Sequence, residues 1–114
     1  MRIINLTKNT TLAEEVEIAK TIWQRGKGLL GRKTLGQGKA LVLWPCDSIH
    51  TFFMQFAIDV IFVDKENRII SVYENLKPFR VTRIYFKAKF AIELPIGTIA
   101  TSSTKIGDTL QIQE

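Results

Sequence analysis

The chain lacks the features that hold small proteins together without a large core, and it lacks long apolar runs. One cysteine among 114 residues cannot form an internal disulfide, so nothing requires an oxidising compartment. The longest apolar runs, 40–44 and 60–63, fall far short of the roughly 20 residues of a membrane span. Residues 1–7 do not have the pattern of a signal peptide. We therefore expect a cytoplasmic protein with no membrane segment.

The composition is that of an ordinary globular domain. Hydrophobic residues make up 46% of the chain and charged residues 24%, which argues against a disordered, collagenous or coiled-coil chain. A chain of this length buries roughly two thirds of its unfolded surface, which is enough for one core. There is no internal repeat and no low-complexity linker. The sequence therefore predicts a single domain over residues 1–114.

Acidic residues are missing from two stretches of the chain. The sequence holds 16 basic and 11 acidic residues, which gives a net charge of +5. In residues 24–46 and 75–92, however, every charged residue is basic. If these basic blocks meet in space, they form a face that attracts an anionic partner, and if they lie apart they are solvated surface. The first basic block is Arg25, Lys27, Arg32, Lys33 and Lys39, and the second is Lys77, Arg80, Arg83, Lys87 and Lys89.

Short apolar segments separated by turns predict a mainly β domain, a small sandwich or barrel with one short helix near residues 21–30. Thr21 is suited to cap that helix, and Ile22, Trp23, Leu29 and Leu30 would share its apolar side. Asp64–Arg68 has the composition of a hairpin loop. Residues 99–104 are polar and predict a loop or an edge. Strands are expected within 2–7, 40–44, 57–63, 69–73, 90–94 and 109–112, and the aromatic residues expected in the core are Trp23, Trp44, Phe52, Phe53 and Phe56.

The second basic block alternates with aromatic residues. Phe79, Tyr85, Phe86 and Phe90 lie among its five bases. That composition suits single-stranded nucleic acid, which binds through base stacking and phosphate contacts. It also suits an amphipathic edge strand whose lysines block aggregation. We favour the edge strand, because no nucleic-acid motif accompanies the pattern.

The polar segment 46–51 interrupts the apolar pattern and contains the only cysteine and the only histidine. Cys46 and His50 could act as a nucleophile and its base, or as two ligands of a metal. They could equally be structural, with Cys46 as a small core residue. Asp59 interrupts an apolar strand, so an inward-facing carboxylate would need a partner such as Arg25 or Arg32. Glu93 interrupts the apolar strand 90–94 in the same way, so it would also need a partner if it faced inward.

Four segments resemble a known family. RGKGLLGR at 25–32, CDSIHTFFM at 46–54 and IDVIFVD at 58–64 are similar to its motifs, and ELPIG at 93–97 followed by IGD at 106–108 resembles its closing pattern. Together they resemble domain-of-unknown-function family 192, a group of small prokaryotic proteins. The resemblance implies a mainly β, sandwich-like fold with a strand at residues 14–19. It implies no established activity, cofactor or catalytic residue.

The leading hypothesis is a small binding module with a concave site for a polar or anionic small ligand, because polar residues within apolar segments concentrate near residues 46–59. The alternatives are a hydrolase-like enzyme that uses Cys46 and His50, and weak nucleic-acid binding by the two basic blocks. No cofactor and no metal are expected. The residues predicted to line the site are Arg25, Arg32, Asp47, His50, Met54 and Asp59.

Overall fold

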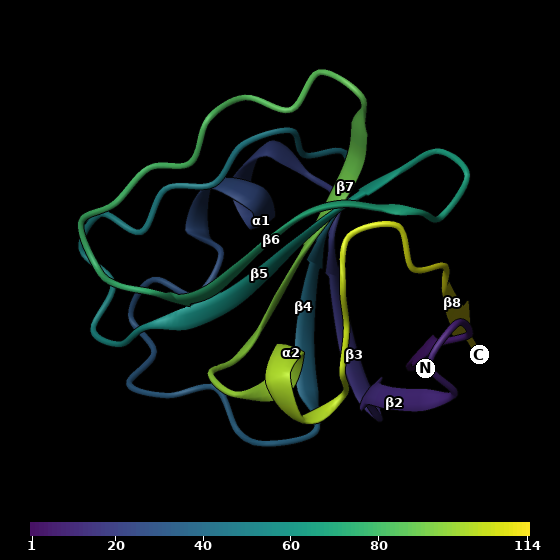
Figure 1. Cartoon of the computed structure of the whole chain (residues 1–114). Helices are drawn as coiled ribbons and strands as arrows, with labels where there is room; N and C mark the ends of the chain where they lie inside the picture. The colour runs from purple at the N-terminus through teal and green to yellow at the C-terminus, as the bar shows by residue number, and fades with distance from the viewer.

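The computed structural model describes all 114 residues and contains eight strands in two sheets with two short helices (Figure 1). It confirms the mainly β fold predicted from the sequence. In chain order the elements are β1 (Arg2–Asn5), β2 (Thr10–Ala13), β3 (Glu15–Ala19), α1 (Ile22–Lys27), β4 (Lys39–Leu43), β5 (Ile58–Asp64), β6 (Ile69–Leu76), β7 (Ala88–Pro95), α2 (Thr98–Thr101) and β8 (Leu110–Gln113).

The larger sheet has the strand order β3-β4-β7-β5-β6, and the smaller one β2-β1-β8. Only β3 and β4 pair in parallel; the other pairs are antiparallel. The hairpin between β5 and β6 is confirmed. The Asp64 carboxylate accepts hydrogen bonds from the amides of Glu66 and Arg68, and Asn67 adopts a φ of +64° that closes the turn. β3 confirms the strand expected at residues 14–19.

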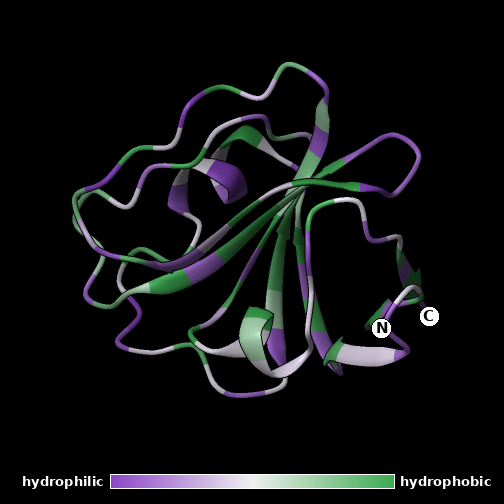
Figure 2. Cartoon of the chain, in the orientation of Figure 1, coloured by the Kyte–Doolittle hydropathy of each residue, from purple (hydrophilic) through white to green (hydrophobic).

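The strands of the larger sheet are mostly hydrophobic (Figure 2), and their buried side chains alternate between two apolar clusters, one on each face of the sheet. In β4, Ala40 and Val42 pack in the cluster that includes residues of the smaller sheet, while Leu41 and Leu43 pack in the cluster on the other face. In β7, Phe90, Ile92 and Leu94 belong to the first cluster and Ala91 belongs to the second. The next residue on the Ala91 face of β7 is Glu93.

Helix α1 begins as predicted but packs differently. The Thr21 hydroxyl accepts a hydrogen bond from the Gln24 amide, and the Gln24 side chain accepts one from the Thr21 amide, which forms a capping box. The prediction that Ile22 and Trp23 face the core is wrong, since none of the helix is buried and Trp23 is 88% exposed. The helix is only six residues long, and the turn at Gly28 delivers Leu29 to the core instead.

Two other aromatic residues expected in the core are also on the surface. Phe53 is 75% exposed, and Phe52 is exposed as well. Both rings lie against Phe79, with centroids 6.5 Å away for Phe52 and 5.5 Å for Phe53. The segment 52–57 contains no strand or helix to direct these side chains inward. Trp44 is half-buried and stacks on Phe90 at 4.4 Å.

Two segments differ from their predicted local structure. Residues 98–101 form the one-turn helix α2 rather than a loop or an edge, because Thr98 and Ser102 satisfy nearby carbonyl groups. Residues 77–87 form no strand, so the predicted edge strand is wrong. They run beside segment 47–51, to which the amides of Thr82 and Tyr85 donate hydrogen bonds at 2.8 Å.

Neither helix is long and apolar enough to cross a membrane.

Candidate functional site

A cavity of about 550 Å³ opens on the second face of the larger sheet. One wall is α1 with the turn that follows it, and the opposite wall is the segment 45–50. Its size falls within the range of small-molecule sites, which is about 300–1,000 Å³. Four side chains from other parts of the chain complete the lining: Leu43, Met54, Ala88 and Glu93.

Glu93 is the buried acid of this cavity. Its position on β7 lies between Leu41 of β4 and Val60 of β5, so apolar neighbours flank it on both sides. The residue is 3% exposed, and its carboxyl group makes no hydrogen bond or ion pair in the chain. Burial raises the pKa of Glu93 from 4.5 to about 7, against the opposing charge of Arg32. The carboxyl group is therefore held in the cavity without a protein partner.

Gly28 brings the turn after α1 against this carboxyl group. A Cβ atom at Gly28 would lie 3.5 Å from Glu93 Oε1 and 3.7 Å from the Arg25 carbonyl oxygen. The backbone there has a φ of +48° and a ψ of −124°, a conformation that favours glycine. Glycine therefore allows the turn to end the helix directly over the acid.

Arg25 joins the two walls of the cavity. Its Nη1 donates a hydrogen bond of 3.1 Å to the carbonyl of Pro45, in the opposite wall. Its Nε is buried and has no partner. Two buried side-chain atoms of the molecule have no hydrogen bond, and they are Arg25 Nε and Glu93 Oε1. Both residues line this one cavity. Such orphaned groups are rare in folded proteins.

Cys46 is a protonated thiol rather than an activated nucleophile. Its Sγ donates a hydrogen bond of 3.1 Å to the Ser48 carbonyl and makes none to His50. Burial raises the pKa of the thiol, and the charges of Glu93 and Asp47 raise it further, while the charge of Arg25 lowers it. The thiol is thus within range of both the Glu93 and the Arg25 charges.

The structure brings together four of the six residues predicted for the site. Arg25, Asp47, His50 and Met54 all line the cavity. The His50 ring is exposed and stacks on Phe52 with centroids 5.4 Å apart, and it makes no hydrogen bond through its side chain. No group of three or more histidine, cysteine, aspartate or glutamate side chains gathers as a metal site requires.

The other two predicted residues lie outside this cavity. Arg32 forms an ion pair with Glu17 at 2.9 Å and lines a smaller neighbouring hollow. Asp59 is fully buried on β5, where its carboxylate accepts hydrogen bonds of 3.0 Å from the amides of Asn75 and Ile99. Its partners are therefore backbone amides, and the expected pairing with Arg25 or Arg32 is wrong.

The two basic blocks adjoin the same segment of chain. The first block contributes Arg25 and Lys27 to one wall of the cavity. The second block follows segment 47–51, where the Thr51 amide donates a hydrogen bond of 2.8 Å to the Arg80 carbonyl. The polar segment singled out in the sequence therefore lies between the blocks.

Sequence reasoning left Glu93 out of the predicted site. The signal was there, because Glu93 is an acid within the apolar strand 90–94. Asp59 gives the same signal within another strand and serves backbone amides instead. The sequence could not separate the two, because their difference lies in what packs against each strand.

The fold and the cavity define a small two-sheet β domain with a pocket beside its larger sheet, lined by both polar and apolar residues. The family model of DUF192, described as "Uncharacterized ACR", matches residues 3–112, and the chain belongs to this family. A UPF0127 protein of Pyrococcus horikoshii is 33% identical over 96% of this chain and 96% of its own length.

Two crystal structures share the fold. One is a protein of unknown function from Novosphingobium aromaticivorans, with a TM-score of 0.85 and 20% identity over 98% of this chain and 84% of that one. The other, from Sinorhizobium meliloti, is described as a candidate transcription regulator; it has a TM-score of 0.79 and 22% identity over 96% of this chain and 89% of its own. At these identities the likeness concerns the fold alone.

Proposed function

We propose that this protein is a binding module for a small polar ligand, and that its site is the cavity between α1 and segment 45–50. The observation that carries the proposal is Glu93, whose carboxyl group is buried, lines an open cavity and has no hydrogen-bond partner in the chain. Buried polar groups in folded proteins are nearly always hydrogen-bonded. A ligand that donates a hydrogen bond would supply the missing partner.

Glu93 destabilises the fold at neutral pH, which supports a functional role. A carboxyl group whose pKa rises from 4.5 to about 7 on folding lowers the free energy of unfolding by about 3 kcal/mol once the pH is above 7. An apolar residue would fill the same position without this loss. Titratable groups that lower the stability of the fold and lie in a cleft are typical of binding and catalytic sites.

The hydrolase-like alternative has less support. A cysteine nucleophile needs a lowered thiol pKa and a base within hydrogen-bond reach. The pKa of Cys46 is instead raised by burial, and its thiol donates to the Ser48 carbonyl. His50 is in the cavity lining but forms no hydrogen bond with the thiol.

Weak nucleic-acid binding remains the second candidate for the surface beside the cavity. Phe79 and Phe86 are exposed among the bases of the second block, as stacking on single-stranded nucleic acid requires. Titration with single-stranded oligonucleotides tests it, because phosphate contacts make affinity fall steeply with salt. Absence of binding at low salt would remove this function. The expected cytoplasmic location stays a prediction that cell fractionation tests.

The binding proposal is tested by a fragment screen that uses NMR chemical shifts. Compounds that bind should shift the signals of Leu29, Ile49 and Met54, which line the cavity. Glu93→Gln should change the set of binding compounds, whereas the control Glu74→Gln, at an exposed position on β6, should not. A screen in which no compound shifts the signals of cavity residues would overturn the proposal.

A further inference from the structure

We propose that the ligand is a small zwitterion, which binds Glu93 through a primary ammonium group and Arg25 through a carboxylate. This inference rests on the function proposed above and names the class of ligand. It follows from the unpaired atoms at two places in the cavity, one that accepts hydrogen bonds and one that donates them.

The accepting end of the cavity is at Gly28. Glu93 Oε1 and the Arg25 carbonyl oxygen both lie within 4 Å of the point that a side chain at Gly28 would occupy. Neither has a donor: Glu93 makes no hydrogen bond, and the Leu29 amide, which would continue α1, does not donate to the Arg25 carbonyl. A carboxylate and a carbonyl at the C-terminal end of a helix attract a cation with several N–H groups. A primary ammonium group has both properties.

The donating end of the cavity is the Arg25 guanidinium. One of its five N–H groups is bound to the Pro45 carbonyl, and the buried Nε–H has no acceptor. A carboxylate can take two parallel N–H groups of one guanidinium. Both ends lie near the Cys46 thiol, since the charge of Glu93 raises the pKa of the thiol and the charge of Arg25 lowers it.

The charges of the lining favour a zwitterion over an anion. The cavity is lined by two permanent cations, Arg25 and Lys27, and by two carboxyl groups, Asp47 and Glu93. A simple anion would leave Glu93 unpaired, and a simple cation would leave Arg25 unpaired, each at the cost of a buried polar group without a partner. A ligand with one charge of each sign satisfies both.

The apolar part of the lining fits an aliphatic skeleton. Leu29, Leu43 and Met54 are buried side chains that also face the cavity. Their surface is apolar and gives no further hydrogen bonds. The combination matches an α-amino acid with a branched aliphatic side chain, for which leucine is a convenient probe.

The test uses the full chain and isothermal titration calorimetry at pH 8, where Glu93 is mostly ionised. The probes are L-leucine and two analogues that each lack one charge, 3-methylbutylamine and 4-methylpentanoate. We expect leucine to bind at least tenfold more tightly than either analogue. A panel of the other amino acids, run by NMR chemical shifts, covers a preference for a different side chain.

Variants assign each charge to its residue. Glu93→Gln should weaken the binding of leucine at least tenfold and leave the affinity for 4-methylpentanoate unchanged. Arg25→Gln should weaken the binding of leucine and leave the affinity for 3-methylbutylamine unchanged. Thermal unfolding of each variant shows that it is folded. Leucine binding that survives Glu93→Gln, or an analogue that binds as tightly as its parent amino acid, would overturn the zwitterion.

The two proposals fail in different ways. If no amino acid shifts the cavity signals but fragments of another class do, the zwitterion is wrong and the binding module stands. If no compound of any class shifts them, both proposals are wrong.

Discussion

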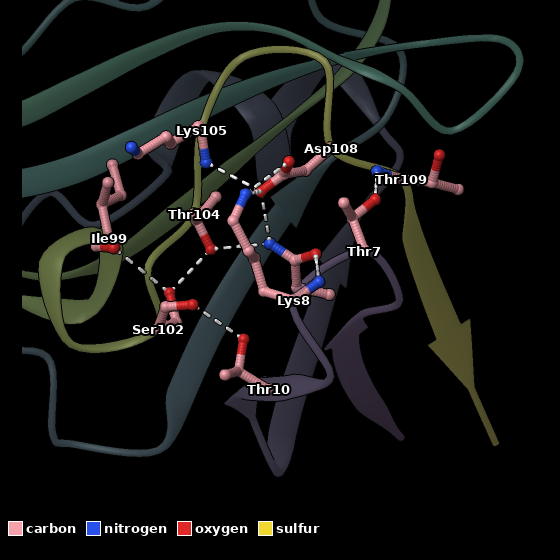
Figure 3. A network of polar contacts seen from close by, with 10 residues as sticks. Thr7, Lys8, Thr10, Ile99, Ser102, Thr104, Lys105, Asp108 and Thr109 are labelled. Atoms are coloured by element: carbon pink, nitrogen blue, oxygen red, sulfur yellow. Dashed lines mark hydrogen bonds and ion pairs between the residues drawn. The ribbon is translucent and has the colours of Figure 1, made fainter.

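The Asn5 side chain donates a hydrogen bond of 2.9 Å to the Asp108 carboxylate, which lies 103 residues away in the sequence and belongs to the polar network drawn in Figure 3. Asn5 is fully buried at the end of β1, and Asp108 is in the loop that leads to β8, separated from that strand by Thr109. Asp108 also accepts from Lys8 Nζ at 2.9 Å and from the Lys105 amide at 2.9 Å. Asp108 thus joins the end of β1 and the turn after it to the loop before β8.

Replacing Asp108 by alanine should therefore weaken the whole fold. The change leaves a donor of Asn5 and the Lys105 amide without an acceptor, and it should lower the free energy of unfolding by about 2–4 kcal/mol. Urea unfolding of the variant and of wild type measures this. A loss below about 0.5 kcal/mol would show that the network does not stabilise the fold.

Asp108 should also make stability depend on acid pH. Burial acts to raise its pKa, but the hydrogen bonds from Asn5 and Lys8 hold the pKa below its usual value. Because the folded state then binds the proton more weakly than the unfolded state, the stabilisation is present above the unfolded pKa and is lost as the pH falls through the folded one. Urea unfolding between pH 2 and 5 should show this loss in wild type and a smaller one in Asp108→Asn.

Glu93 should have the opposite effect near neutral pH. Its pKa is raised on folding from 4.5 to about 7, so the folded state binds the proton more tightly and stability falls as the pH rises through this window. Wild type should lose about 2–3 kcal/mol between pH 5 and 8, and Glu93→Gln should lose much less. Glu74→Gln, at an exposed position on β6, is the matched control and should keep the wild-type slope. Equal slopes in wild type and Glu93→Gln would contradict the assignment.

Binding of an ammonium ligand should strengthen over the same pH range. The ligand needs the ionised carboxylate, and about a tenth of Glu93 is ionised at pH 6 against about nine tenths at pH 8. The affinity should therefore rise roughly tenfold between these values. The charged and titratable groups around Glu93 are Arg32, Arg25, Lys27, Asp47, His50 and Cys46. Calorimetry of leucine at pH 6, 7 and 8 tests the prediction, and an affinity that does not change with pH would contradict it.

Replacing the exposed Trp23 should have little effect on the stability of the fold. Its side chain is 88% exposed on a helix with no buried residue, so Trp23→Ala should change the free energy of unfolding by less than about 0.5 kcal/mol. Leu29→Ala should instead lose about 2–5 kcal/mol, because Leu29 is buried in the second cluster. Thermal denaturation of the pair compares them directly. A large loss for Trp23→Ala would mean that this ring is covered in solution.

Local signals predicted much of the fold. The capping residue Thr21 and the hairpin loop at 64–68 appear where expected, because both depend on hydrogen bonds between near neighbours in sequence. The packing of Trp23 and Phe53 was not predictable in this way. A large aromatic residue is buried only if some element covers it, and that depends on contacts far along the chain.

The site was half predictable for a related reason. Arg25, Asp47, His50 and Met54 come from two of the motifs that carry the family resemblance and line one cavity. Glu93 was not selected, because β7 is buried on both faces and its apolar run gives no contrast that marks the cavity side. Its position beside Gly28 and the end of α1 is visible only in the folded structure.

The pairing of β1 with β8 puts the two ends of the chain side by side, with Arg2 opposite Gln113, and no residue of these strands lines the cavity (Figure 1). A tether, label or fused domain attached at either end would leave from the same corner of the molecule. Immobilisation through one end on a sensor surface should therefore keep the pocket mouth open to solvent. A peptide linker that joins the ends should give a circular permutant, with new termini in the hairpin at Asp64–Arg68, in which the pocket is intact.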